Sequence, residues 1–303
     1  MKYVRWWTGA GRITELNKLG VYLEMIKFQH SVFALPFAYL GAFLAEMKVP
    51  GFITLLWITI AMVGARSFAM ALNRLIDMEI DRRNPRTAER ALPKGLLSVS
   101  NTVIFSLVSL VLFLLAVYNL APVCRYLWPV AVLPFIIYPY TKRFTCLSHF
   151  VLGLSLGLAP VGAWIAVTNT ISFEPFLIGA AVLLWVAGFD ILYAIQDIDF
   201  DRSHRLFSIP ARFGIGTSLA ITRVLHLFSI VTLVVLGARL HMGVFYFAGI
   251  VISAILLAYE NSLLKPDDVS RLNMAFFTLN GLVSIILFCF AAIEVVVTRM
   301  RFV

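Results

Sequence analysis

Residues 52–81 read FITLLWITIAMVGARSFAMALNRLIDMEID, and this stretch decides the kind of fold. Its first two thirds are apolar apart from one charge, Arg66, and a helix of about 20 such residues crosses a bilayer core. Three polar side chains then follow at intervals of four residues, namely Asn73, Asp77 and Asp81. Residues four apart lie on one face of a helix, with Cβ atoms about 5–6 Å apart. The stretch therefore predicts a transmembrane helix that ends with two carboxylates on one face.

The composition of the whole chain is that of a membrane protein. Of its 303 residues, 61% are hydrophobic and 14% are charged, whereas soluble domains carry about 25% charged residues. The apolar runs lack the alternation of barrel strands, so they predict helices, whose backbones satisfy their own hydrogen bonds in lipid. The fold class is therefore all-α: a polytopic membrane protein with about nine transmembrane helices. We place these helices at residues 28–47, 52–78, 101–121, 126–141, 147–168, 175–197, 216–238, 242–260 and 274–298.

The net charge is +9, and the distribution of the basic residues along the chain indicates how the chain is oriented in the membrane. Lys and Arg concentrate in the segments expected on the same side as residue 1, which the positive-inside rule places in the cytoplasm. With nine helices, the C-terminus lies outside. Segment 1–27 lacks the apolar core of a signal peptide and carries Trp6 and Trp7, which predicts a segment at the level of the lipid headgroups. This distribution argues against nucleic acid as a partner and for membrane lipid.

The acidic end of the first stretch has a second copy later in the chain. Residues 190–201 read DILYAIQDIDFD, and Asp197 and Asp201 repeat the first Asp pair at an offset of 120 residues. A loop containing bases, Pro and Gly follows each copy, over residues 82–100 and 202–215. We therefore expect one domain, residues 1–303, made of two pseudo-repeated halves around a central cavity, with both loops cytoplasmic and over the site.

Two rows of acidic or amide side chains, each on one helical face, lie beneath the basic loops. One row is Asn73, Asp77 and Asp81, and the other is Asp190, Asp197 and Asp201. These two stripes predict a site for a metal-bound diphosphate. Carboxylates at this spacing repel each other and are costly near lipid unless a cation is present. Asp offers only oxygen donors, which suit Mg²⁺, and Mg²⁺ commonly takes one or two carboxylates together with substrate phosphates. The alternative is that loop arginines simply neutralise acidic helix ends. Two stripes at corresponding places favour the metal site, since intramembrane acids are functional by default.

Four motifs, together with the chain length, resemble the UbiA superfamily of intramembrane prenyltransferases. The first signature is NxxxDxxxD at 73–81 followed by NPRTxxR at 84–90, and the second is DxxYAxQDxxxD at 190–201. YTKRFT at 140–145 is similar to a short loop of the 4-hydroxybenzoate polyprenyltransferases, and RSFAMALNRLID at 66–77 to their RSxAxxxN run. One departure is an Ala, residue 91, where many members have Pro. We expect it to affect loop rigidity rather than chemistry.

The resemblance implies Mg²⁺-dependent transfer of a prenyl group from an isoprenoid diphosphate to an acceptor, commonly an aromatic ring. Two ions are expected, because bound Mg²⁺ stabilises the charge on the leaving diphosphate. One would be held by Asp77 and Asp81 and the other by Asp197 and Asp201, with Asn73 as a neutral ligand or positioning group.

The remaining site residues are expected around this centre. Lys142 and Arg143 would close on phosphate oxygens, with Arg86 and Arg90 as further candidates; the alternative is that such bases only set the topology. The π faces of Tyr140 and Tyr193 would stabilise the allylic cation, unless both are interfacial aromatics. Asp190 and Arg66 lie deeper and would serve the acceptor, one as a base for its hydroxyl and the other as a partner for an acceptor oxygen. Structural pairing with an acid is the alternative for Arg66.

The acceptor is the least readable part of the prediction. The stretch KFQHSVFALPFA at 27–38 resembles the branch of the family associated with quinone biosynthesis, particularly the menaquinone route. This favours a hydroxybenzoate or dihydroxynaphthoate. A glycerol-phosphate ether lipid, a haem precursor or a chlorophyll precursor would use the same metal site. A cation-coupled secondary transporter also uses intramembrane acids and paired repeats, but its acids cluster at the bilayer midplane rather than at helix ends.

Overall fold

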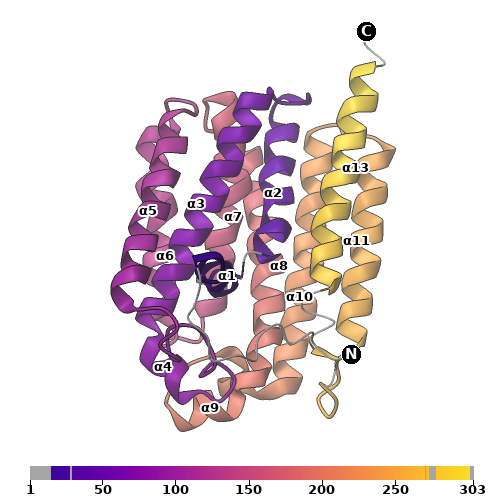
Figure 1. Cartoon of the computed structure of the whole chain (residues 1–303). Helices are drawn as coiled ribbons and strands as arrows, with labels where there is room; N and C mark the ends of the chain where they lie inside the picture. Colours follow the sequence, from indigo (N-terminus) through magenta and orange to yellow (C-terminus); the bar gives the residue numbers. More distant parts are fainter. Residues whose placement is uncertain (1–14, 28, 270, 273–277, 301–303) are drawn as a thin grey trace.

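The computed structural model of the protein describes residues 15–27, 29–269, 271–272 and 278–300, and Figure 1 shows their arrangement as an upright bundle of helices. Within these residues the chain is helical and contains no β-strand. The helices are α1 (Glu15–Met25), α2 (Gln29–Glu46), α3 (Phe52–Ile76), α4 (Met78–Arg83), α5 (Val99–Tyr118), α6 (Cys124–Thr141), α7 (Ser148–Thr168), α8 (Glu174–Ala194), the 3₁₀ turn η1 (Ile195–Asp197), α9 (Ile198–Ser203), α10 (Ile209–Arg239), α11 (Val244–Ser262) and α13 (Asn280–Met300).

The predicted all-α membrane architecture is confirmed in the described part of the chain. Nine helices there have 18 residues or more, namely α2, α3, α5, α6, α7, α8, α10, α11 and α13. Among the described residues, seven candidate membrane spans are long and apolar enough to cross a bilayer, and they involve all of these helices except α2 and α6. Helix α6 contains three internal prolines. The starts of the predicted first and last spans, residue 28 and residues 274–277, lie outside the described residues.

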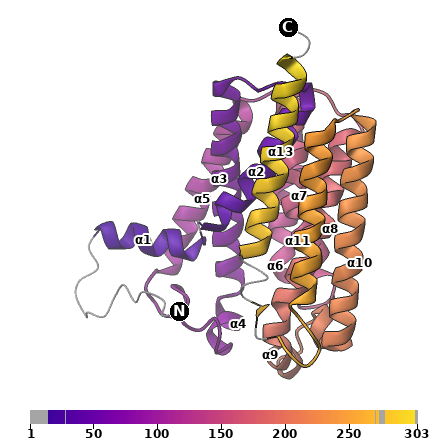
Figure 2. The same cartoon turned by 90° about the vertical axis from the view of Figure 1, so that its right-hand side faces the viewer.

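Helix α1 lies across the upright bundle rather than along it (Figure 2). The Tyr22 ring stacks on Phe105 of α5, with ring centroids 5.0 Å apart, and Met25 belongs to a hydrophobic cluster with Ala71 of α3. These contacts hold α1 against α3 and α5. Of the predicted interfacial segment, residues 1–14 lie outside the described residues.

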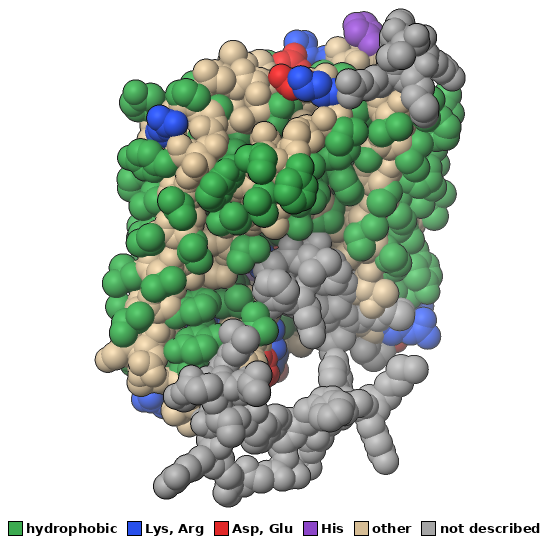
Figure 3. Space-filling model, turned by 45° about the horizontal axis from the view of Figure 1, so that its top comes forward, with side chains coloured by type: hydrophobic (Ala, Val, Ile, Leu, Met, Phe, Trp, Pro, Cys, Tyr) green, Lys and Arg blue, Asp and Glu red, His purple; other side chains and the backbone are tan. Residues whose placement is uncertain are grey.

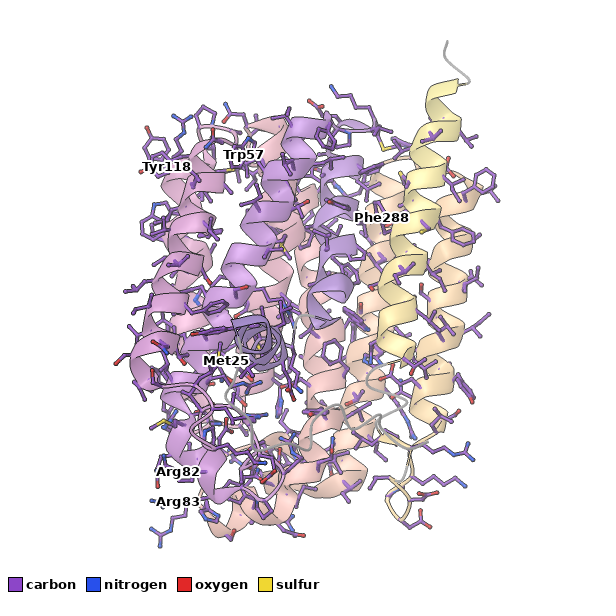
Figure 4. The ribbon with its side chains drawn as sticks, in the orientation of Figure 1. Met25, Trp57, Arg82, Arg83, Tyr118 and Phe288 are labelled. Atoms are coloured by element: carbon purple, nitrogen blue, oxygen red, sulfur yellow. The ribbon has the colours of Figure 1, made fainter. Side chains whose placement is uncertain are left out.

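Side chains are distributed over the surface as a membrane bundle requires. Figure 3 shows hydrophobic side chains over the flank of the bundle, with most of the visible charged groups near its two ends. In Figure 4, Arg82 and Arg83 of α4 lie at one end, while Trp57 and Tyr118 lie at the other. Trp and Tyr favour the membrane–water boundary. The chain is therefore a multi-pass membrane protein.

Helix α7 packs closely on α2, α6 and α8. Small residues allow this, as is usual between helices in membranes. A Cβ built on Gly157 of α7 would lie 2.5 Å from the carbonyl oxygen of Gly179 of α8, and one on Gly41 of α2 would lie 2.3 Å from that of Pro160. At Gly162, by contrast, a Cβ meets no heavy atom within 4 Å. One side of α7 is therefore tightly packed and another faces open space.

This difference predicts unequal effects of two matched substitutions on stability. Gly157→Leu should push α7 away from α8 and lower the free energy of unfolding by about 1–3 kcal/mol, the usual cost of overpacking. Gly162→Leu should leave it nearly unchanged, because the new side chain enters open space. Thermal unfolding of the two variants in detergent measures the difference. Equal melting temperatures would mean that the α7–α8 contact is looser than the structure has it.

Candidate active site

Both acidic motifs lie where a long helix breaks. Helix α3 ends at Ile76 and α4 begins at Met78, so Asp77 lies at the break with φ −94° and ψ 3°. In the second half, Asp197 ends η1 and precedes α9 with φ −106° and ψ 7°. Such angles fall in the sparsely allowed bridge region, where many active-site residues lie. The sequence had predicted unbroken helices through 78 and 197; the structure corrects this and gives the two halves the same local geometry.

Asp77 is a buried carboxylate held by three side chains. Lys142 Nζ lies 2.7 Å from its Oδ2, Asn73 Nδ2 donates to the same oxygen at 3.0 Å, and Arg143 Nη2 lies 3.3 Å from Oδ1. Arg143 also donates to the carbonyl oxygens of Pro139 at 2.6 Å and Ile76 at 3.0 Å. The predicted YTKRFT loop is thus joined to the end of α3, and Arg143 is largely engaged with backbone.

Asp81 and Asp197 are each held by an arginine of the 82–100 loop. Arg90 Nη1 donates to both oxygens of Asp81 at 2.7 Å. Arg86 forms a fork on Asp197, with Nε 2.9 Å from Oδ1 and Nη2 2.5 Å from Oδ2, and Asn84 Nδ2 adds a bond of 2.8 Å. The first half of the chain therefore supplies the groups that close over the carboxylate of the second half.

Arg86 keeps its charge in this setting. Burial by itself lowers the pKa of Arg86, but its hydrogen bond to Asp197 and the negative charge of that carboxylate outweigh burial and raise the pKa above its usual value. Its Nη1 also donates to the Tyr193 hydroxyl at 2.9 Å, and its guanidinium carbon lies 5.0 Å from the Tyr193 ring centroid. The Asp201 carboxylate is bound differently, by the Ser208 hydroxyl at 2.7 Å.

Asp190 lies deeper and is paired with a histidine that the sequence did not single out. His149 Nδ1 lies 2.7 Å from Asp190 Oδ2, while the Ile209 backbone N–H donates to His149 Nε2 at 3.4 Å. The tautomer with its proton on Nδ1 fits both contacts, because it donates to Asp190 and leaves Nε2 free to accept. A lone His near the start of a helix carries no signal of this contact, which depends on how α7 packs on α8.

Arg66 lies in the wall of the cavity that Asp190 and His149 also line. Within the part of the chain that the structure describes, it forms no ion pair, and its Nε is buried without a hydrogen-bond partner. A buried guanidinium nitrogen without a partner costs free energy. The alternative of structural pairing with an acid is therefore not realised among the described residues, and the group is available to an anionic ligand.

One cavity of about 1040 Å³ collects nearly all of these residues. Its polar end continues into a long arm of apolar side chains from α3, α5, α6 and α7. The predicted site residues that line it are Arg66, Asn73, Asp77, Asp81, Arg86, Arg90, Lys142, Asp190, Tyr193, Asp197 and Asp201, and the residues that the sequence did not single out include Lys27, Arg74, Asn84, Tyr138, His149 and Ser208.

Two predicted residues are not among the described residues that line this cavity, Tyr140 and Arg143. Tyr140 is 45% exposed, and its ring lies under the Arg143 guanidinium, 5.3 Å from ring centroid to carbon. Tyr138, two residues earlier on α6, lines the cavity instead. Successive side chains of α6 are turned by about 100°, so tyrosines two residues apart face different surroundings. The exposed position of Tyr140 therefore does not support the prediction that its ring stabilises the allylic cation.

A family model, a curated relative and a solved structure all relate this chain to the UbiA prenyltransferases. The model of the UbiA prenyltransferase family matches residues 34–282. A 4-hydroxybenzoate octaprenyltransferase of Marinobacter nauticus is 32% identical over 243 residues, which cover 80% of this chain and 82% of that protein. Among solved structures, a UbiA homologue from Aeropyrum pernix K1 is 31% identical with a TM-score of 0.80, covering 90% of this chain and 98% of that one.

A more distant solved structure shows the same fold. It is a UbiA homologue from Archaeoglobus fulgidus bound to GPP and Mg²⁺, 18% identical with a TM-score of 0.68, covering 91% of this chain and 99% of that one.

Proposed function

The chain belongs to the UbiA prenyltransferase family, and on this premise we propose that it transfers a prenyl group from an isoprenoid diphosphate to an aromatic acceptor of the 4-hydroxybenzoate type. The observation that carries the proposal is the single cavity that joins acidic side chains of both halves to a long apolar arm. A diphosphate fits the charged end and an isoprenoid tail fits the arm.

The residues at the charged end fit Mg²⁺ that arrives with the diphosphate. Asp77, Asp81, Asp197 and Asp201 offer only oxygen donors, which Mg²⁺ prefers. Among the described residues, no group of three or more His, Cys, Asp or Glu side chains is placed to hold an ion by itself. Since Mg²⁺ commonly combines one or two carboxylates with phosphate oxygens, we assign one ion to each pair, two in all. When bound, Mg²⁺ supplies charge stabilisation to the leaving diphosphate.

The basic side chains would exchange their carboxylate partners for phosphate. Arg86, Arg90 and Lys142 line the cavity and contact Asp197, Asp81 and Asp77. A bound diphosphate with its cations would neutralise the same carboxylates, so these side chains can turn to phosphate oxygens without leaving a buried charge unpaired. They thereby hold the leaving group and exclude water.

Lys142 and its neighbour Arg143 should then differ in their effects on substrate binding. Lys142→Ala should raise the KM for prenyl diphosphate about tenfold or more, as expected for a lost charge-assisted contact, and leave the KM for the acceptor unchanged. Arg143→Ala should lower the melting temperature, because Arg143 bonds to the backbone of α3 and α6. Steady-state kinetics and thermal unfolding of both variants distinguish the two roles. A selective rise in diphosphate KM for Arg143→Ala would instead place that residue on the phosphate.

Arg66 and Asp190 would hold the acceptor between the charged end and the arm. At 1.5 Å per residue, Arg66 is about 16 Å along α3 from Asp77, and Asp190 about 10 Å along α8 from Asp197. Both side chains therefore lie deeper than the carboxylates of the charged end, and both line the same cavity. We assign Arg66 to the acceptor carboxylate and Asp190, oriented by His149, to the hydroxyl and its proton. Tyr193, which lines the same end, offers its π face to the developing allylic cation.

The roles proposed for Arg66 and Asp190 suit any aromatic acceptor that carries a carboxylate and a hydroxyl. The names of curated relatives favour 4-hydroxybenzoate, while dihydroxynaphthoate, the acceptor of the menaquinone route, presents a carboxylate and a hydroxyl to the same two groups. We also propose that the acidic helix ends and residue 1 face the cytoplasm, which the distribution of Lys and Arg supports.

The purified enzyme supplied with labelled geranyl diphosphate, Mg²⁺ and a panel of acceptors tests the proposal. We expect a prenylated aromatic product with 4-hydroxybenzoate, less with 1,4-dihydroxy-2-naphthoate, and none with glycerol-phosphate ether lipids, which lack an aromatic ring. Product formed from the ether lipid alone would overturn the aromatic assignment. Uptake of an ion into proteoliposomes without consumption of the diphosphate would favour a transporter instead.

A further inference from the structure

The end of α1 and the loop between α4 and α5 share one cluster of apolar side chains. Met25 and Ile26 at the end of α1 are 5% and 3% exposed. Leu92 and Leu97 of the loop are 4% and 5% exposed, and all four side chains belong to the same buried cluster. Within this loop, which the structure describes throughout, Leu92 and Leu97 are the buried apolar residues. They therefore anchor the loop on α1.

This anchor matters because the loop carries basic side chains of the charged end. Arg90 lies two residues before Leu92 and donates to both oxygens of Asp81 at 2.7 Å. The Lys94 N–H donates to the Arg90 carbonyl oxygen at 3.0 Å, and the Gly95 N–H donates to that of Leu92 at 2.9 Å. The turn that contains Leu92 therefore fixes the backbone of Arg90.

A polar contact joins α1 to the first acidic motif as well. Met25 is the last residue of α1, and the carbonyl oxygens of the last turn have no partner within the helix. Arg74 of α3 is 7% exposed and donates through Nε to the Met25 carbonyl oxygen at 3.4 Å. Its Nη1 donates to Asn73 Oδ1 at 3.3 Å. A cation is favourable at a helix C-terminus, so this contact supports the same placement of α1.

We infer that the end of α1 positions the basic loop, so that Met25 and Ile26 set where the Arg90 guanidinium meets the diphosphate. The inference rests on the proposed function, since it takes the charged end of the cavity as the diphosphate site. Neither Met25 nor Ile26 is among the described residues that line the cavity, so both act through the loop and not on the substrate. Arg66 and Asp190 lie deeper along α3 and α8, so binding of the acceptor should not depend on this packing.

Isothermal titration of geranyl thiolodiphosphate with Mg²⁺ into the full-length protein in detergent tests this inference. Ile26→Ala should weaken binding of the analogue about fivefold or more, because a loosened loop must be ordered when the diphosphate binds. In steady-state kinetics the KM for prenyl diphosphate should rise by the same factor, while kcat and the KM for the acceptor stay unchanged. Ile26→Val keeps most of the buried side chain and should restore the wild-type affinity.

Two exposed leucines provide matched controls. Leu23 of α1 is 39% exposed and Leu96 of the loop is 46% exposed, and neither belongs to the cluster. Leu23→Ala and Leu96→Ala should bind the analogue as the wild type does. Leu92→Ala removes the loop's side of the contact and should weaken the analogue as Ile26→Ala does, so the test does not depend on the folding of one variant.

A double substitution shows whether α1 acts through Arg90. If it does, Ile26→Ala should weaken the analogue less than about twofold in an Arg90→Ala background, since changes within one contact network are not additive. The full loss in that background, or wild-type affinity of both Ile26→Ala and Leu92→Ala, would overturn the inference. Failure of the wild-type protein to bind the analogue would instead contradict the proposed function and, with it, the inference.

Discussion

Replacing Asp197 or Asp77 with alanine is expected to lower the turnover of prenyl transfer about 10²-fold or more. Each carboxylate lies at a helix break at the charged end of the cavity. Each would contribute oxygen ligands to the cation that stabilises the leaving diphosphate. The loss should therefore appear in kcat with saturating substrates. It is measured as labelled product formed per unit time at saturating geranyl diphosphate, acceptor and Mg²⁺.

Each half of the chain offers a matched control for this experiment. Asp199 lies on α9 two residues from Asp197, and Glu79 on α4 two residues from Asp77, yet both are exposed and neither lines the cavity. Glu79 pairs only at the surface with Arg82 and Arg83. Asp199→Ala and Glu79→Ala should keep wild-type turnover. Near-normal activity of both cavity variants with Mg²⁺ present would refute the two-ion assignment.

Replacing Asp190 with asparagine should also lower kcat about 10²-fold or more, the usual range for a lost general base. Asparagine keeps the size of the side chain and can still bond to His149, but it cannot take the acceptor's proton. Asp190 lies about 10 Å along α8 from Asp197, whereas Mg²⁺–oxygen distances are about 2.1 Å. Mg²⁺-dependent binding of a non-cleavable diphosphate analogue should therefore survive in Asp190→Asn and be lost in Asp197→Asn.

Isothermal titration of that analogue against the wild type and the two variants separates the acceptor site from the metal site. If Asp190→Asn loses analogue binding as badly as Asp197→Asn, Asp190 belongs with the diphosphate and the assignment is wrong. His149→Gln adds a check on positioning. It should lower kcat less than Asp190→Asn, since the carboxylate remains but its orientation is looser.

The contacts around Asp197 show how the two halves depend on each other. Asn84 and Arg86 follow the first acidic motif, yet both bind the carboxylate of the second. Within the first half, Arg90 binds Asp81 and Lys142 binds Asp77. Local unfolding of the 82–100 loop would remove Arg90 from Asp81 and both Asn84 and Arg86 from Asp197, which is costly where the carboxylate is shielded from water. The loop and the acidic ends should therefore become ordered together.

The number and type of the long helices were readable from the sequence because lipid imposes one simple requirement. A backbone inside a bilayer satisfies its own hydrogen bonds, so a long apolar run becomes a helix almost regardless of its neighbours. The acidic residues were readable for a related reason: a carboxylate at the edge of an apolar run is costly unless it has a task. Their repetition after 120 residues then predicted the two halves.

The breaks at Asp77 and Asp197, the pairing of His149 with Asp190 and the long apolar arm of the cavity were decided only by the tertiary structure. Periodicity assigns a residue to a helical face, but it does not say which helix lies opposite that face or whether the space there is filled. For the same reason Tyr138 and Tyr140 could not be told apart from the sequence. Apolar residues and glycines look alike along the chain whether they pack on a neighbouring helix, as Gly157 does, or border a cavity, as Gly162 does. Only the relative positions of several helices fix the depth and shape of the space between them.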